Sequence, residues 1–234
     1  TLADINGDFH VHSDYSDGTM SIREMIKAAQ KRGYKALAFT DHSQSLNIAN
    51  GLSVEEVKKQ WQEIEEVRKE FPDFLILKGI EVDIKKDGSL DYTDEILAGF
   101  DIVIASVHAN FSLPKDEMTE RIIKAMENPY VNIIGHPTGR MLGQRQPFEF
   151  DFEKVLKKAK RNNVILEINA SPSRFDLDDS MARDSLREGV KLIINTDSHH
   201  KDQYEYMKYG IYIARRAWVQ KEDIVNTYSI NELK

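Results

Sequence analysis

Short apolar segments alternate with helical segments along the whole chain, and this alternation limits the possible folds more than any other feature. In the helical segments, apolar residues recur at three- and four-residue spacing. This order is typical of βαβ units, whose strands are parallel and whose helices cover the sheet. The predicted strands are residues 7–12, 36–40, 74–84, 102–107, 131–135, 164–170 and 191–196.

Local signals mark where the first helices begin and end. Ser21 stands three residues before Glu24, and Ser53 stands three residues before Glu56, so each pair predicts a capping box at a helix start. Gly33 is the expected C-cap of the first helix, and Pro72 ends the second. Residues 209–217 are ambiguous, and we expect one more strand or a packing segment there.

Seven such units in 234 residues predict an α/β fold with a closed or nearly closed (β/α) barrel. The alternative is a doubly wound open sheet. Since no linker or internal repeat interrupts the series, we expect one domain over residues 1–234. The chain begins with Thr1 rather than methionine, which we interpret as a domain cut from a longer protein or as a processed chain.

Every histidine lies at or just beyond the carboxyl end of a predicted strand. The carboxyl ends of parallel barrel strands open on one face, where such folds keep their active sites. We therefore expect these imidazoles to meet in one cleft, together with the acidic side chains of Asp17, Glu81 and Asp197. The seven histidines are His10, His12, His42, His108, His136, His199 and His200.

The strand-end residues favour a metal centre. His10 and His12 are two positions apart in a strand, so their side chains point to the same side, and Asp17 can curl back toward them. Imidazole and carboxylate together suit zinc, manganese or iron. Taken alone, His136 is equally compatible with a buried histidine whose polar atoms bind backbone.

The number of candidate ligands exceeds what one ion needs. We exclude His200, which points away from His199 along the chain, and six histidines and three carboxylates remain. A single zinc takes about four ligands, so the set predicts two or three ions with Glu81 as a bridge. Clustered metals commonly catalyse phosphoester hydrolysis.

Four further residues have two interpretations each. Asp41 is either a carboxylate that orients a metal-bound imidazole, which we favour, or a simple cap. Arg140 and Arg174 follow the fifth and sixth strands, so both can reach the mouth of the cleft and are candidates to bind phosphate. A solvated arginine or a local ion pair explains each equally well. Asn169 either contacts substrate or braces a loop.

Composition limits the chemistry and the partners. Without cysteine, any metal must be held by His, Asp and Glu. The net charge of −7 argues against a free-standing basic nucleic-acid binder. No apolar run reaches membrane-spanning length and no signal peptide is present, so we expect a cytoplasmic protein with no membrane partner.

The strand-end motifs resemble the ordered motifs of the PHP (polymerase and histidinol phosphatase) superfamily. That resemblance implies a distorted (β/α)7 barrel that holds three divalent metal ions, zinc and/or manganese. The motifs are His10-Val11-His12-Ser13 with Asp17-Gly18, Thr40-Asp41-His42-Ser43, Gly79-Ile80-Glu81-Val82-Asp83, Ser106-Val107-His108, Gly135-His136-Pro137 and Asn195-Thr196-Asp197-Ser198-His199.

The resemblance also implies how the ligands divide among the ions. One ion takes His10, His12, Glu81 and Asp197. A second shares Glu81 and takes His108 and His136. A third takes Asp17, His42 and His199.

A narrower set of motifs is similar to the C-terminal PHP domain of bacterial and archaeal family X DNA polymerases. The set includes Asn50-Gly51-Leu52-Ser53, His136-Pro137-Thr138-Gly139-Arg140 and Leu166-Glu167-Ile168-Asn169-Ala170. This likeness implies a polymerase module in the parent chain and 3′-5′ exonuclease activity, with 3′-end cleaning or abasic-site cleavage, in DNA repair. The implied nucleophile is a hydroxide held between metals.

Two other functions stay open. One is a small-molecule phosphatase of the histidinol-phosphate type, which uses the same fold and metals. The other is a non-enzymatic barrel that keeps metals only for stability.

Overall fold

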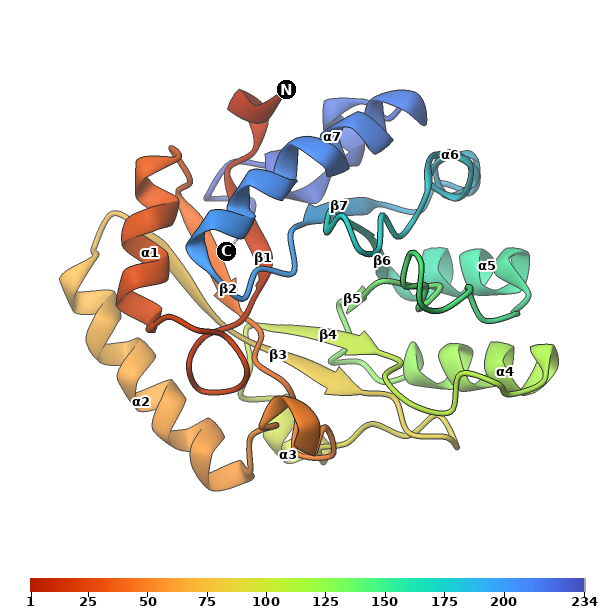
Figure 1. Cartoon of the computed structure of the whole chain (residues 1–234), viewed down its shortest axis with the longest axis horizontal. Coiled ribbons are helices and arrows are strands. Elements are labelled where there is room, and N and C mark those ends of the chain that lie inside the picture. Colours follow the sequence, from red (N-terminus) through yellow and green to blue (C-terminus); the bar gives the residue numbers. More distant parts are fainter. Residues whose placement is uncertain (234) are drawn as a thin grey trace.

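Seven parallel strands form one sheet in the order β1-β2-β3-β4-β5-β6-β7 in the computed structural model, which describes residues 1–233 (Figure 1). Their order in space equals their order in the sequence, whereas a doubly wound sheet reverses its strand order. The predicted barrel is therefore confirmed and the open-sheet alternative is wrong. The strands are β1 Gly7–Val11, β2 Ala36–Phe39, β3 Leu75–Asp83, β4 Ile102–Ser106, β5 Ile133–Ile134, β6 Ile165–Asn169 and β7 Leu192–Asn195.

The first and last strands meet just beyond their ends. Val11 forms an isolated parallel bridge with Ser198, and the backbone N–H of His12 donates to the Ser198 carbonyl at 2.8 Å. This seam nearly closes the barrel. It also brings the chain around residue 10 next to the chain around residue 197, which matters for the site below.

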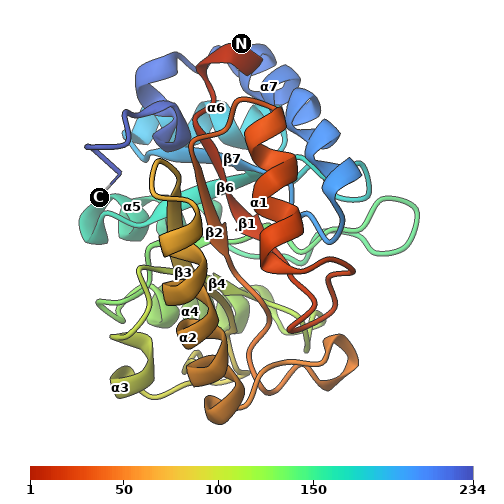
Figure 2. The ribbon, with the colours of Figure 1, turned by 90° about the vertical axis from the view of Figure 1, so that its left-hand side faces the viewer.

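The helices cover the outside of the strands (Figures 1 and 2). Both predicted capping boxes form, since Ser21 and Glu24, and likewise Ser53 and Glu56, exchange backbone and side-chain hydrogen bonds. The C-cap of α1 is Arg32 rather than the predicted Gly33, which is the next residue and has the left-handed φ of +84° that glycine commonly adopts there. The helices are α1 Ile22–Lys31, α2 Val54–Glu70, α3 Asp94–Leu97, α4 Lys115–Ala125, α5 Phe152–Asn162, α6 Asp179–Glu188 and α7 Met207–Arg216.

Of the two interpretations of residues 209–217, the strand is wrong, because residues 209–216 belong to α7 and Ala217 is its C-cap. The aromatic and β-branched residues of this segment favour a strand locally. The segment is nevertheless a helix, because its apolar residues recur at three- and four-residue spacing and are buried on one helical face. Met207, Ile211 and Ala214 are buried on one face. Gly210 lets this helix approach β7 closely, since an added Cβ would lie 2.3 Å from a methyl group of Ile194.

The core has two parts, because side chains alternate across each strand. The larger part packs between the strands and the helices. The smaller part forms inside the barrel, away from the carboxyl ends of the strands, from Phe9, Ala36, Ala38, Ile104, Ile133 and Ile193. The interior near the carboxyl ends is instead polar.

Across residues 1–233, the helices are each too short or too polar to cross a membrane.

Candidate metal centre

One group of donor atoms lies at the seam between β1 and β7. His10 and His12 are fully buried, and the Nε2 atom of His10 lies 3.3 Å from Oε2 of Glu81 and 3.5 Å from Oδ1 of Asp197. The Nε2 atom of His12 lies 3.7 Å and 3.2 Å from the same two oxygens. Ligands about 2.1 Å from a tetrahedral ion are separated by about 3.4 Å, so these distances match a four-ligand site.

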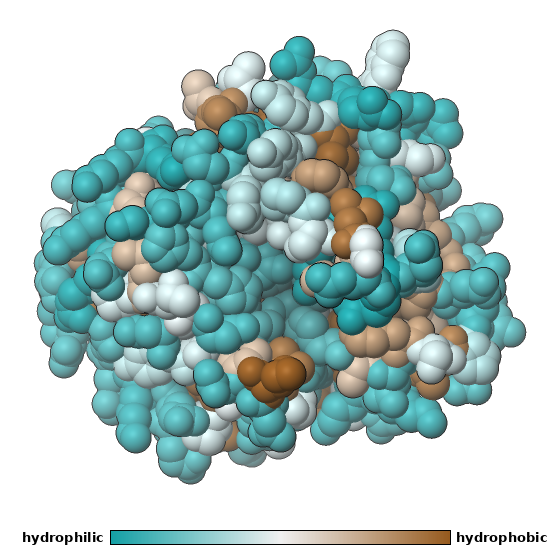
Figure 3. Space-filling view, in the orientation of Figure 1, coloured by the Kyte–Doolittle hydropathy of each residue, from teal (hydrophilic) through white to brown (hydrophobic). Residues whose placement is uncertain are grey.

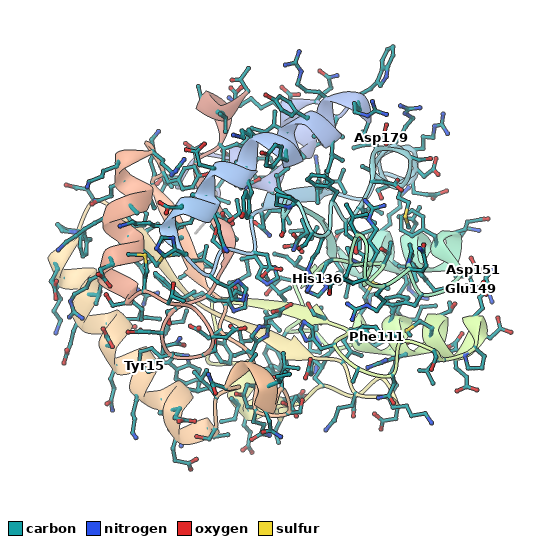
Figure 4. All side chains as sticks on the ribbon, viewed as in Figure 1. Tyr15, Phe111, His136, Glu149, Asp151 and Asp179 are labelled. Atoms are coloured by element: carbon teal, nitrogen blue, oxygen red, sulfur yellow. The ribbon has the colours of Figure 1, made fainter. Side chains whose placement is uncertain are left out.

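Glu81 reaches a second group through its other oxygen. Its Oε1 atom lies 2.8 Å from Nε2 of His136 and 3.3 Å from Nε2 of His108. Because one carboxylate contacts both groups, Glu81 has the position of a bridging ligand. His136 has a φ of 26°, a left-handed conformation that histidine adopts rarely, and this directs its ring into the barrel mouth near the centre of Figure 4.

The third group lies around Asp17. Its Oδ1 atom is 3.2 Å from Nε2 of His199, 3.6 Å from Nε2 of His42 and 3.7 Å from Nδ1 of His12. His42 also places Nδ1 3.0 Å from Oε2 of Glu81, so the three groups are contiguous. The structure thus gathers all nine predicted ligand residues into one cluster.

Donor atoms of this cluster lack hydrogen-bond partners although they are buried. An orphaned buried polar atom is costly, and a metal ion satisfies lone pairs of nitrogen and oxygen. This observation fits divalent cations. Within residues 1–233, the buried unpartnered atoms of the cluster are His10 Nε2, His12 Nδ1 and Nε2, His42 Nδ1, Glu81 Oε2, His108 Nε2 and His136 Nδ1.

Ionisable groups of both signs lie close together in the cluster. Burial disfavours ionisation of Glu81 and Asp197, yet the surrounding histidines, His10 first, hold the pKa of both carboxyls well below the usual range. Burial and the neighbouring imidazoles of His199 and His42 lower the pKa of His12 to about 3. The carboxylates are therefore ionised and the His12 ring is neutral, as metal binding needs. In contrast, despite burial, neighbouring carboxylates raise the pKa of His108 and of His199 to about 9, so these two rings must lose a proton when a cation binds.

A carboxylate that the sequence analysis did not single out orients two of these groups. Glu167 on β6 is fully buried, and its Oε1 lies 2.7 Å from Nδ1 of His10. Its Oε2 accepts from the backbone N–H of His136 at 2.7 Å. Glu167 could have been identified from the sequence because it is a glutamate inside an apolar strand. The same pattern identifies Glu81. Asp83 plays a similar part, with Oδ1 2.5 Å from Nδ1 of His108.

The favoured interpretation of Asp41 is wrong. Its carboxylate accepts hydrogen bonds from Ser13, Ser16 and Gln60, and so holds the loop after β1 rather than an imidazole. Asp41 thereby positions the loop that carries Asp17. Successive side chains in extended backbone point to opposite sides, so the next residue, His42, points into the cluster.

Replacing Glu167 with glutamine is expected to weaken divalent metal binding about 10- to 100-fold, as is typical when a residue that orients metal ligands is changed. Glutamine keeps the shape but loses the charge that orients the His10 ring. Isothermal titration with zinc or manganese measures the change. Glu153→Gln on the exposed face of α5 is the matched control, and equal affinities for the two variants would contradict the assigned role.

Six residues of the cluster line the floor of a cleft of about 570 Å³, namely Asp17, His42, Glu81, His108, Asp197 and His199. In Figure 3 the hollow near the middle of the face is hydrophilic, with hydrophobic residues beside it. The cleft walls come from the loops after β2, β4, β5 and β6. They include Leu46, Ile48, Ala49, Phe111, Met141, Gln144, Arg145 and Arg174.

The predicted substrate residues occupy different positions. Arg174 lines the cleft, with Nε 3.3 Å from Oδ2 of Asp197. Arg140 lies behind it and donates from Nε to the Arg174 carbonyl at 2.7 Å, so it braces the loop. Asn169 is buried and donates to both Glu167 and Asp197 at 3.1 Å. His200 lies apart from the cluster, as expected, and its Nδ1 accepts from the backbone of Asp202.

A parallel barrel with a mouth of histidines and carboxylates defines the class of metal-dependent barrel hydrolases. A family model described as the PHP domain matches residues 8–171. The chain belongs to the PHP family of metal-dependent phosphoesterases.

Relatives of two kinds are similar in sequence. The DNA polymerase/3′-5′ exonuclease PolX of Bacillus subtilis is 44% identical over 233 residues, and the chain spans 41% of its length. A probable phosphatase of Thermoanaerobacter sp. (strain X514) is 32% identical over 232 residues, covering 94% of this chain and 89% of that protein.

Solved structures share the fold. The histidinol phosphate phosphatase of Lactococcus lactis, solved with zinc, L-histidinol and phosphate, aligns with a TM-score of 0.67 at 20% identity, covering 92% of this chain and 94% of that one. A putative histidinol phosphatase of Listeria monocytogenes aligns with a TM-score of 0.64 at 14% identity over 84% of this chain and 96% of that one.

Proposed function

We propose that this domain hydrolyses DNA phosphodiester bonds as a 3′-5′ exonuclease in DNA repair, with 3′-end processing or abasic-site cleavage as related reactions. The observation that supports the proposal is the cluster of nine metal-type side chains, six of which line an open cleft. The 44% identity with PolX of Bacillus subtilis supports DNA as the substrate.

We assign three divalent ions, zinc and/or manganese, to the three donor groups. His10, His12, Glu81 and Asp197 would hold the first ion. His108 and His136, with Glu81 shared, would hold the second. The third would be held by Asp17, His42 and His199.

When bound, such ions activate a water molecule and stabilise the charge that develops on the phosphoryl oxygens. The chain itself supplies the rest of the chemistry. Arg174 has a buried Nη1 without a hydrogen-bond partner within residues 1–233, and the head group borders the cleft. It is therefore placed to donate to a phosphate oxygen. Glu167 and Asp83 hold the rings of His10 and His108 in position.

DNA binding by this domain alone is expected to be weak. Phosphate contacts dominate the affinity of proteins for DNA, and the net charge here is −7. In our proposal, a polymerase module of the parent chain provides most of the affinity for DNA. A dissociation constant for duplex DNA below about 1 µM at 0.15 M salt, tighter than typical non-specific binding, would contradict this expectation.

A small-molecule phosphatase of the histidinol-phosphate type is the second candidate. The observation in its favour is that the probable phosphatase relative aligns over almost its whole length. A substrate of this size also fits a cleft of about 570 Å³.

One experiment separates the two candidates. A labelled 3′-recessed oligonucleotide and histidinol phosphate are each incubated with manganese, with zinc and with chelator. We expect metal-dependent shortening of the oligonucleotide and little release of phosphate from histidinol phosphate. His136→Ala serves as the inactive control, and activity that survives this substitution counts against the cluster as the active site.

A further inference from the structure

The cleft combines two kinds of surface, and the proposed hydrolysis uses only one of them. The floor is made of imidazoles, carboxylates and Arg174, which suit a phosphate. The walls contain apolar and aromatic side chains, including Phe111, Met141 and Ile48. A phosphate group alone needs no such walls, so they point to a substrate with an aromatic or apolar part beside the phosphate.

Arg145 presents a flat surface on one wall. Its guanidinium carbon lies 3.6 Å from the centre of the Phe111 ring, which is a stacking distance. Its Nε donates to the carbonyl of Gly139 at 2.7 Å, and its backbone exchanges two hydrogen bonds with Met141 at 2.8 and 2.9 Å. The guanidinium plane is therefore held before any substrate arrives. Figure 4 shows Phe111 between the central cluster and α4.

Ile48 stands on the loop after β2, three strand positions away from the loop of Arg145. With 93% of its surface exposed, it is the most exposed large hydrophobic residue in the described chain. The loop is nevertheless tied to the metal-binding strands. The backbone N–H of Leu52 donates to the carbonyl of His42 at 2.8 Å, and Asn50 takes a left-handed φ of 53°.

We propose that Arg145, supported by Phe111, stacks on the nucleobase of the nucleotide whose phosphate lies on the cleft floor, and that Ile48 contacts this base from across the mouth. This inference rests on the proposed function. Arginine planes and aromatic rings stack on unpaired bases of any sequence. A cleft of about 570 Å³ is large enough for a nucleotide.

The test compares two single-stranded oligonucleotides that differ only at the 3′-terminal nucleotide, which carries either adenine or an abasic tetrahydrofuran. The wild-type chain is expected to cleave the adenine end with a kcat/KM about 10- to 100-fold higher. Arg145→Ala should reduce this preference to less than about threefold. Arg145→Lys keeps the charge but loses the plane, so it should behave like the alanine variant.

A second readout does not depend on hydrolysis. An oligonucleotide with 2-aminopurine at its 3′ end and a phosphorothioate at the last linkage should lose fluorescence when the wild-type chain binds it, because stacking quenches this base. Arg145→Ala should show much less quenching. Arg187→Ala, at an arginine that is 72% exposed on α6, is the matched control and should behave as the wild type.

The outcomes distinguish the two proposals. If Arg145→Lys keeps the full preference for the adenine end, or if Arg145→Ala slows cleavage of both substrates equally, the side chain acts on phosphate. The proposed stacking of Arg145 on the base is then wrong. Absence of quenching by the wild-type chain also overturns it. Quenching that depends on Arg145, without cleavage of either oligonucleotide, would support stacking of Arg145 on the base and refute DNA hydrolysis.

Discussion

Replacing Glu81 with glutamine is expected to lower the rate of phosphodiester hydrolysis on the order of 10³-fold while the fold is retained. Glu81 is 1% exposed, and its two oxygens contact different donor groups: Oε2 faces His10, and Oε1 faces His136. Glutamine has nearly the same shape but carries no charge, so two groups of donors lose their shared anionic ligand.

Hydrolysis of bis(p-nitrophenyl) phosphate with added manganese or zinc measures this effect, and circular dichroism checks the fold. Glu95→Gln, at an exposed position in α3, is the matched control and should keep full activity. If Glu81→Gln retained more than about a tenth of the wild-type rate, a bridging role for this carboxylate would be untenable.

Removal of divalent metal is expected to lower the melting temperature by about 8–16 °C. A ligand present at 1,000 times its dissociation constant stabilises the native state by about 4 kcal/mol, and about 1 kcal/mol shifts the melting temperature of a chain of this size by about 2–4 °C. The physical reason is the buried cluster, in which unpartnered imidazole nitrogens such as those of His12 and His42 remain when no cation is bound.

Thermal melts after dialysis against chelator, with and without added zinc or manganese, measure this shift. His12→Ala should respond little to metal, whereas His200→Ala, outside the cluster, should respond as the wild type does. A shift smaller than about 2 °C for the wild-type chain would argue against metals as part of the folded structure. A large shift without any hydrolytic activity would instead favour the non-enzymatic alternative.

Much of the fold could be predicted because it depends on periodic burial. The alternation of apolar runs and amphipathic segments identified all seven strands, and the rule that active sites lie at the carboxyl ends of barrel strands placed the cluster. The least regular elements were harder. The strand predicted at residues 131–135 pairs only over Ile133–Ile134, because the chain bends into the mouth at His136. Segment 209–217 followed burial rather than local propensity.

The sequence analysis predicted which histidines and carboxylates gather at the barrel mouth. It did not predict which residues hold them in position. A sequence cannot show whether a buried acid contacts a cation or an imidazole, so Glu167 and Asp41 were not distinguished by residue type alone. The Arg145–Phe111 pair was missed for a different reason. These residues lie in irregular loops after separate strands, where no periodic pattern indicates which side chains meet.

The seam between β1 and β7 has a consequence for biosynthesis. Within this domain, the ribosome makes His10 among the first residues, whereas Asp197, which shares its donor group, is made near the end. A nascent chain therefore has no complete first group until the last strand has emerged and docked against the first. The first donor group is therefore expected to bind a cation only after the whole domain has been translated.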